Sequence, residues 1–101
     1  MAIAEISVVP LGTKTPSVSQ YVARVIKALR LENDVRYETT AMGTIVEGEV
    51  DRILAVVRRM HEAAFADEVQ RVVTTVKIDD RRDKTVAIQD KIASLNRELS
   101  K

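Results

Sequence analysis

A pair of strand-like segments between two helix-like segments is the feature that most limits the fold of this chain. Residues 35–50, VRYETTAMGTIVEGEV, are rich in β-branched residues on both sides of a tight connection at 41–43. Strands joined this closely form a hairpin, and Gly43 is expected to take the positive φ that other residues avoid. The centre of the chain is therefore predicted to be a β-hairpin.

The segments on either side of the hairpin alternate between strand and helix patterns. Residues 2–11 and 69–78 have the alternation or the β-branched content of strands. Apolar residues at helical spacing predict helices over 17–31, 51–65 and 84–99. The order is β-α-β-β-α-β-α, and its first six elements match the ferredoxin-like βαββαβ arrangement. The seventh element is an additional C-terminal helix.

The predicted architecture is one α+β domain over residues 1–101, with two helices on one face of an antiparallel sheet. Ser17 and Asp51 are the expected N-caps of the first two helices, and Thr15 competes with Ser17. The open sheet face is expected to be half apolar, which favours a homo-oligomer, a dimer or a tetramer. The alternative is a monomer whose last helix folds across that face.

Composition excludes several classes of function. The net charge of +1 gives no overall attraction to nucleic acid or to an anionic membrane. The chain has no cysteine, so thiolate metal sites are excluded, and its single histidine, His61, cannot form a multi-histidine site. No apolar run approaches the ~18 residues that span a bilayer. We expect a cytoplasmic protein without metal or cofactor, in which His61 is a packing or interface residue.

Two hydroxyl-rich stretches are the candidate binding regions. Residues 10–21, PLGTKTPSVSQY, lead into a helix N-terminus that favours an anion, although capping alone also explains their hydroxyls. Residues 37–49, YETTAMGTIVEGE, place hydroxyls, a thioether and a carboxylate around a tight turn, where they could hold a small heterocycle. Glu47 could pair with an aminopyrimidine-type donor. Threonine is also common in strands for packing reasons alone.

The sequence lacks the residues that two activities found on this architecture require. Base stacking on RNA needs exposed aromatic residues, and the first, third and fourth predicted strands have none. Acyl-phosphate hydrolysis needs an arginine in the first loop, which offers only Lys14. No nucleophile–base pair is evident, and Glu47 with Glu49 is expected to be solvated or salt-bridged. We expect no catalytic residues.

The charged stretch 74–84, TTVKIDDRRDK, contains acidic and basic residues close together. If the strand continues through it, Asp79 and Arg81 lie on one side, and Asp80 and Arg82 on the other. Each side then carries one acid and one base, which favours ion pairing within the turn or across a subunit boundary over a phosphate clamp. These four residues are the predicted interface.

The chain resembles the thiamine-binding-protein-like family over nearly its whole length. The resemblance is carried by VVPLGT, SVSQYVA, YETTAMGTIVEGE and TTVKIDDRRDK, in this order. The family is similar to proteins that bind thiamine or its hydroxymethylpyrimidine moiety, and its members form dimers and tetramers through their sheets and C-terminal helices. The resemblance implies a non-enzymatic role with a thiamine-like small-molecule ligand. The ligand-binding residues that it indicates are Thr13, Ser17, Ser19, Thr39, Met42, Gly43, Thr44 and Glu47.

The leading hypothesis is therefore an oligomeric protein that binds thiamine or hydroxymethylpyrimidine without transforming it. The alternative is a structural or regulatory homo-oligomeric assembly protein with no small-molecule ligand.

Overall fold

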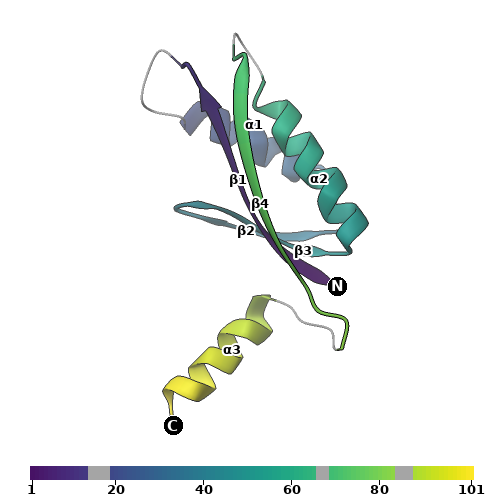
Figure 1. Cartoon of the computed structure of the whole chain (residues 1–101), viewed down its shortest axis with the longest axis vertical. Helices are drawn as coiled ribbons and strands as arrows, with labels where there is room; N and C mark the ends of the chain where they lie inside the picture. Colours follow the sequence, from purple (N-terminus) through teal and green to yellow (C-terminus); the bar gives the residue numbers. More distant parts are fainter. Residues whose placement is uncertain (14–18, 66–68, 84–87) are drawn as a thin grey trace.

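Seven elements follow one another along the chain in the predicted order. The computed structural model describes residues 1–13, 19–65, 69–83 and 88–101. The elements are β1 (Ala2–Leu11), α1 (Ser19–Leu29), β2 (Arg36–Thr40), β3 (Gly43–Gly48), α2 (Val50–Ala63), β4 (Arg71–Asp80) and α3 (Ile88–Leu99). Figure 1 shows the four strands with α1 and α2 on one side of the sheet and α3 away from both helices.

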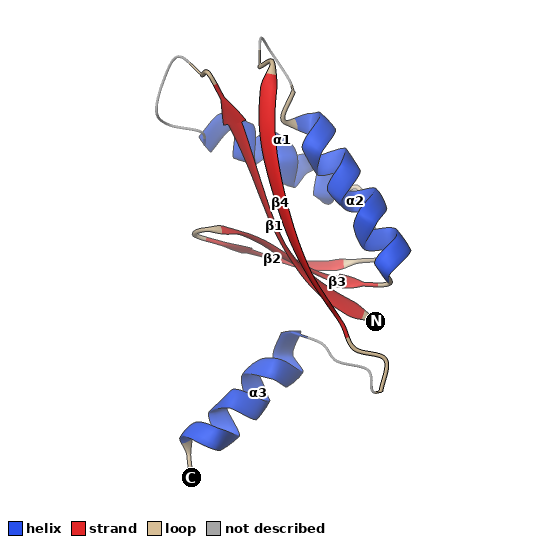
Figure 2. Ribbon diagram, viewed as in Figure 1, coloured by secondary structure: helices blue, strands red, loops and turns tan. Residues whose placement is uncertain are grey.

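The strands form one antiparallel sheet in the order β2-β3-β1-β4. This order confirms the predicted ferredoxin-like α+β fold. The two neighbours of β1 differ in length of pairing. β4 pairs with β1 along the whole strand, from Ala2 to Leu11, whereas β3 pairs with it only as far as Ile6. The upper half of β1 and β4 in Figure 2 therefore continues past the β2–β3 hairpin as a two-stranded ribbon.

Strand alternation separates a buried face from an open one. Ala4 and Ile6 on β1 and Val46 on β3 face the two helices and are buried. They pack with side chains from both helices, and the core cluster includes Val25, Leu29, Ile53, Val56 and Met60. Burying such side chains contributes roughly 1.5–3 kcal/mol each and holds the helix layer on the sheet.

Charged residues also connect the two helical segments. Glu32, just after α1, is buried, and it forms ion pairs with Arg52 and Arg59 on α2. Arg52 also donates to Asp34, and this hydrogen bond lowers the pKa of the Asp34 carboxyl. A buried carboxylate requires such partners, because an unpaired charge in the interior is costly. These contacts hold the end of α1 against α2.

Helix α3 touches the rest of the chain only near its start, within the described residues. Ile88 is buried, and its backbone N–H donates a 2.9 Å hydrogen bond to Glu47 on β3. Lys91 reaches Asp79 on β4 at 2.6 Å. Beyond this point the apolar residues predicted to form one stripe are exposed: Ile92, Leu95 and Leu99 are 52%, 58% and 73% exposed. No helix in the described ranges is long and apolar enough to cross a membrane.

Two local predictions were wrong. Gly43 does not have a positive φ; among the described glycines only Gly12 does, at 77°. Gly43 is needed for a different reason: a Cβ there would lie 2.8 Å from the carbonyl oxygen of Ile6. Asp51 lies in the first turn of α2, and the N-cap is Glu49, which makes no side-chain capping hydrogen bond. The predicted caps Ser17 and Thr15 lie outside the described residues.

Candidate functional site

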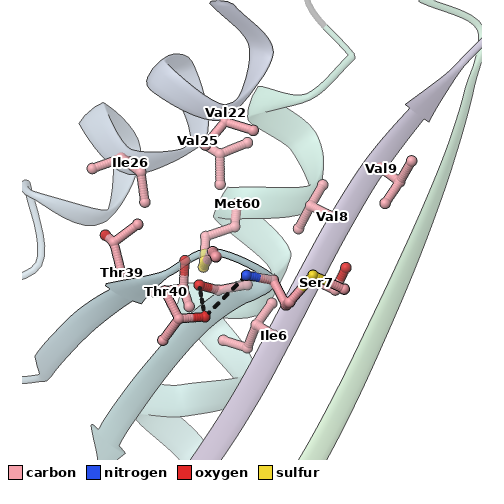
Figure 3. A pocket seen from close by; sticks show the side chains of 14 residues that line it. Ile6, Ser7, Val8, Val9, Val22, Val25, Ile26, Thr39, Thr40 and Met60 are labelled. Carbon is pink, nitrogen blue, oxygen red and sulfur yellow. Dashed lines mark hydrogen bonds between the residues drawn. The ribbon is translucent and has the colours of Figure 1, made fainter. Parts of the chain in front are cut away.

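A cavity of about 320 Å³ lies where the β2–β3 hairpin, α1 and the upper part of β1 meet. It occupies the space beyond the end of the β1–β3 pairing. In Figure 3, Val22, Val25 and Ile26 reach it from α1, and Thr39 and Thr40 from the hairpin. The other lining residues are Ile6, Ser7, Val8, Val9, Ala41, Met42, Gly43, Thr44 and Met60. The cavity thus has aliphatic and thioether walls with hydroxyl groups at several points.

The hairpin turn has its own internal hydrogen bonds. The Thr40 hydroxyl donates to the Gly43 carbonyl oxygen at 2.9 Å and accepts from the Met42 N–H at 3.2 Å. This arrangement closes the two-residue turn at Ala41 and Met42. Because the only proton of the Thr40 hydroxyl is used within the turn, this side chain can offer a bound molecule only an acceptor.

The absent side chain of Gly43 brings the turn close to β1. A methyl group at this position would meet backbone, the carbonyl oxygen of Ile6, which cannot move without breaking the sheet. Glycine therefore permits the short distance between the hairpin and β1 that forms one end of the cavity.

The structure brings together four of the predicted ligand-binding residues. Thr39, Met42, Gly43 and Thr44 all line the cavity. Thr44 is buried and Met42 is 87% exposed, so the four residues extend from the floor of the cavity to its rim.

Three predicted residues come from the first loop and the start of α1. Thr13 is half-buried and is not among the lining residues of this cavity. Ser17 and the side chain of Ser19 lie outside what the structure describes.

Glu47 lies on the opposite face of the sheet from the cavity. It is three residues along β3 from Thr44, and an odd separation in a strand reverses the direction of the side chain. Glu47 is 4% exposed, and its carboxylate accepts from the Ile88 N–H, with Arg36 at 3.8 Å. A separate hollow of about 330 Å³ adjoins it, between β2 and the start of α3. Glu47 is therefore placed to hold α3, not to line the cavity.

The sequence had a partial signal for the residues that it missed. Val22 and Val25 belong to the apolar stripe that predicts α1, and Met60 to the stripe of α2. A stripe normally indicates core packing. Here the apolar stripe of α1 extends past the end of β3. Some residues of the stripe therefore face a cavity, in the place where a longer β3 would have packed against them.

The lining of the cavity carries no ionised side chain among the described residues. The described ranges also contain no group of three or more His, Asp or Glu side chains placed to hold a metal ion. The cavity therefore favours an uncharged apolar molecule that makes a few hydrogen bonds, which is the usual chemistry of small-ligand sites.

The charged residues at the end of β4 form ion pairs within the chain. Asp80 pairs with Arg82 at 3.1 Å, as the alternation predicted, whereas Arg81 pairs with Asp83 at 2.6 Å. Asp79 pairs with Lys91 instead, and this hydrogen bond lowers the pKa of the Asp79 carboxyl. These pairs belong to the connection between β4 and α3. A role for Asp79, Asp80, Arg81 and Arg82 at a subunit boundary stays a prediction.

His61 packs between α2 and the sheet, as expected from its position beside the apolar stripe. Its Nδ1 lies 2.7 Å from the Thr74 hydroxyl on β4, and its ring meets Phe65 edge to face, with centroids 5.2 Å apart. The first contact links α2 to β4, and the second packs the ring against the residue that follows α2.

Comparison with known proteins gives consistent results over nearly the whole chain. The sequence profile of the family described as thiamine-binding protein matches residues 4–96. The UPF0045 protein YqgV of Bacillus subtilis is 46% identical over 102 residues, which cover 98% of each chain. The UPF0045 protein of Methanothermobacter thermautotrophicus is 44% identical over 98% of this chain and all of its own.

A solved structure shares the fold as well as the sequence. The crystal structure of MJ1052 from Methanocaldococcus jannaschii superposes with a TM-score of 0.86 at 39% identity, covering 94% of this chain and 95% of the other. The profile match and the full-length relatives agree, and the chain belongs to the thiamine-binding protein family.

Proposed function

We propose that this protein binds a small thiamine-related ligand, thiamine or hydroxymethylpyrimidine, without transforming it. The observation that carries the proposal is the cavity between α1 and the hairpin. It is lined by Thr39, Met42, Gly43 and Thr44, four of the residues that the family resemblance indicates as ligand-binding. Its volume of about 320 Å³ is at the lower end of the range for small-molecule sites. Family membership supports the thiamine-related chemistry of the ligand.

The chemistry of the lining supports binding without catalysis. The walls are formed mainly by Val, Ile and Met side chains, and the polar groups are Ser and Thr hydroxyls. General acid–base catalysis requires a titratable group within hydrogen-bond reach of the reacting atom, and the described lining supplies hydroxyls only. Such a site can orient a ring by its hydroxyls and hold it by contact with its aliphatic walls.

The protein is also proposed to be a homo-oligomer. Helix α3 exposes Ile92, Leu95 and Leu99 along one face. The open face of the sheet exposes Val9 on β1 and Val73 on β4. Two exposed apolar surfaces on a chain of this size favour association, because covering either surface removes apolar area from water. A second copy of the chain offers both surfaces.

A substitution at the mouth of the cavity tests the binding proposal. Val22 is on α1, lines the cavity and is exposed, so Val22→Trp is expected to fill the entrance without disturbing the core. Ala23 is the next residue, is exposed and does not line the cavity, so Ala23→Trp adds the same indole group as a matched control. Both variants and the original protein are titrated with thiamine and with hydroxymethylpyrimidine by calorimetry.

The expected result is binding by the original protein and Ala23→Trp, with a loss of at least tenfold in Val22→Trp. Equal affinity in all three proteins would show that the ligand does not bind in this cavity. No heat and no thermal shift at millimolar concentrations of either compound would reject the binding proposal.

The second candidate function is structural or regulatory assembly without a small ligand. The exposed stripe of α3 favours it, because this stripe is suited to contacts between chains whether or not the cavity is occupied. Light scattering distinguishes the candidates when combined with the titrations. If the protein is an oligomer that binds neither compound, the result supports assembly without a ligand. If the protein is a monomer, the result counts against the assembly function.

A further inference from the structure

Two methionines line the cavity, and they differ sharply in their exposure to solvent. Met42, in the turn of the β2–β3 hairpin, is 87% exposed, whereas Met60, on α2, is 1% exposed. One thioether is therefore at the rim of the cavity and the other in its buried part, where Figure 3 shows Met60. A reagent in solution reaches the first sulfur and not the second.

The sheet fixes the backbone of Met42 beside the cavity. β2 and β3 pair as far as Thr40 and Gly43, directly next to the turn. The Met42 N–H donates to the Thr40 hydroxyl at 3.2 Å, and this hydroxyl donates to the Gly43 carbonyl oxygen at 2.9 Å. The unbranched side chain of methionine still changes rotamer readily, so it can cover the mouth of the cavity from this fixed point.

A thioether that is exposed to solvent is open to oxidation by a peroxide. A new S–O bond forms, the O–O bond of the peroxide breaks, and the proton of the transferred oxygen passes to the leaving oxygen. Sulfur loses two electrons and the peroxide gains them, so hydrogen peroxide yields methionine sulfoxide and water. In the folded chain this reaction is expected at Met42, because the sulfur of Met60 is shielded by the core.

Oxidation changes what Met42 offers to a molecule in the cavity. A sulfoxide is polar and carries a strong acceptor oxygen, whereas the thioether is apolar. The Thr40 hydroxyl already donates its only proton to Gly43, so it cannot satisfy the new oxygen. Covering a bound molecule would take that oxygen out of water, which opposes binding.

We infer that Met42 is a site of reversible oxidation that regulates the cavity: its thioether covers a bound small molecule, and its sulfoxide lowers the affinity for that molecule. The oxidant class is a hydroperoxide. Enzymatic reduction by a dithiol returns the thioether and releases the oxygen as water. This inference rests on the proposed function and adds regulation of the same site.

Peptide mass mapping of the folded full chain in hydrogen peroxide tests the site. Met42 is expected to be oxidised about tenfold or more faster than Met60. Saturating thiamine or hydroxymethylpyrimidine is expected to slow the oxidation of Met42, because the bound molecule shields the sulfur that covers it. Free methionine in the same sample is the control, and its rate of oxidation is expected to stay unchanged.

Calorimetry after removal of the peroxide measures the effect on binding. The affinity of the oxidised protein is expected to be about fivefold or more lower. Met42→Leu removes the exposed sulfur, and Met60→Leu removes the buried one as a matched control. The readout for each variant is the ratio of its affinities before and after peroxide. This ratio is expected to be one in Met42→Leu and to match that of the original protein in Met60→Leu.

The outcomes separate this inference from the proposed function. If the protein binds either compound and its affinity is the same after oxidation of Met42, the inference is overturned and the proposed function stands. A loss of affinity that persists in Met42→Leu, or oxidation of Met60 as fast as Met42, also overturns the inference alone. Failure of both compounds to bind the untreated protein overturns both.

Discussion

The backbone N–H of Ile88, at the start of α3, donates a 2.9 Å hydrogen bond to Oε2 of Glu47 in the middle of the fold. The two residues are 41 positions apart, and both are buried. The carboxylate acts as a distant N-cap. It accepts a hydrogen bond from one of the free amides of the helix, and its negative charge interacts favourably with the positive end of the helix dipole. Glu47 therefore connects the ferredoxin-like body to the additional helix.

Replacing Glu47 is expected to release α3. Glu47→Ala leaves the Ile88 N–H buried without its acceptor, at a cost of about 1–3 kcal/mol in the free energy of unfolding. Glu47→Gln keeps an acceptor oxygen and is expected to lose less. Urea unfolding followed by circular dichroism measures both. An unchanged unfolding midpoint in Glu47→Ala would contradict the capping role, and ligand affinity is expected to stay unchanged because Glu47 does not line the cavity.

The two glycines of β3 form a matched pair for testing how close the hairpin must lie to β1. In Gly43→Ala the new methyl meets the Ile6 carbonyl oxygen at 2.8 Å, so the backbone must shift, at an expected cost of about 1–3 kcal/mol. In Gly48→Ala the methyl meets Cγ1 of Val35 at 3.1 Å, a side-chain atom that can move. Gly48→Ala is therefore expected to lose less stability.

Chemical denaturation of both glycine variants, with a ligand titration of each, checks this difference. Gly43→Ala is expected to weaken binding as well, because it displaces one end of the cavity. Equal stability of the two variants would show that the hairpin has room to move.

The ion pair between Asp79 and Lys91 predicts a pH-dependent contribution to the anchoring of α3. The hydrogen bond from Lys91 lowers the pKa of Asp79 below its usual value of 3.8. A carboxyl with a lowered pKa in the folded state stabilises it above pH 3.8, and the contribution is lost as the pH falls through the lowered pKa. The pair is exposed, so the effect is small and decreases with salt.

A double-mutant cycle with Asp79→Asn and Lys91→Gln measures this pair. Its coupling energy, from unfolding curves, is expected to favour the folded state at pH 7 and to be smaller at pH 2. A coupling of the same size at both values of pH would show that the charge of Asp79 is not involved.

The exposed face of α3 is expected to be buried in the oligomer. Leu95→Glu places a charge in that face and is expected to shift the mass measured by light scattering toward the monomer. Ser94→Glu places the same charge on the other side of the helix and is expected to leave the mass unchanged. Dissociation by both variants would indicate a general effect of charge, and dissociation by neither would exclude this face from the interface.

Local pattern was sufficient to predict most of the fold. The alternation of Ala4, Ile6 and Val8 predicts β1 with the bounds that it has, and the apolar stripes predict all three helices. The pairing lengths could not be predicted, because the end of β3 opposite Ile6 depends on where the hairpin turns relative to β1. That single tertiary feature creates the cavity.

The candidate site was predictable only in part for the same reason. Thr39 and Thr44 could be placed together because they face each other across a predicted hairpin. From the sequence, Val22 and Met60 are predicted to be core residues. Nothing in their own segments indicates that β3 ends before it reaches them. The odd separation of Glu47 from Thr44 along β3 places Glu47 on the open face of the sheet, away from the cavity.

A crystal structure of the protein soaked with hydroxymethylpyrimidine tests the central claim most directly. We predict electron density for the ring between α1 and the hairpin, in contact with Val22, Thr39 and Met60. Density on the open face of the sheet beside Glu47, or an empty cavity at a concentration that saturates binding in solution, would contradict the claim.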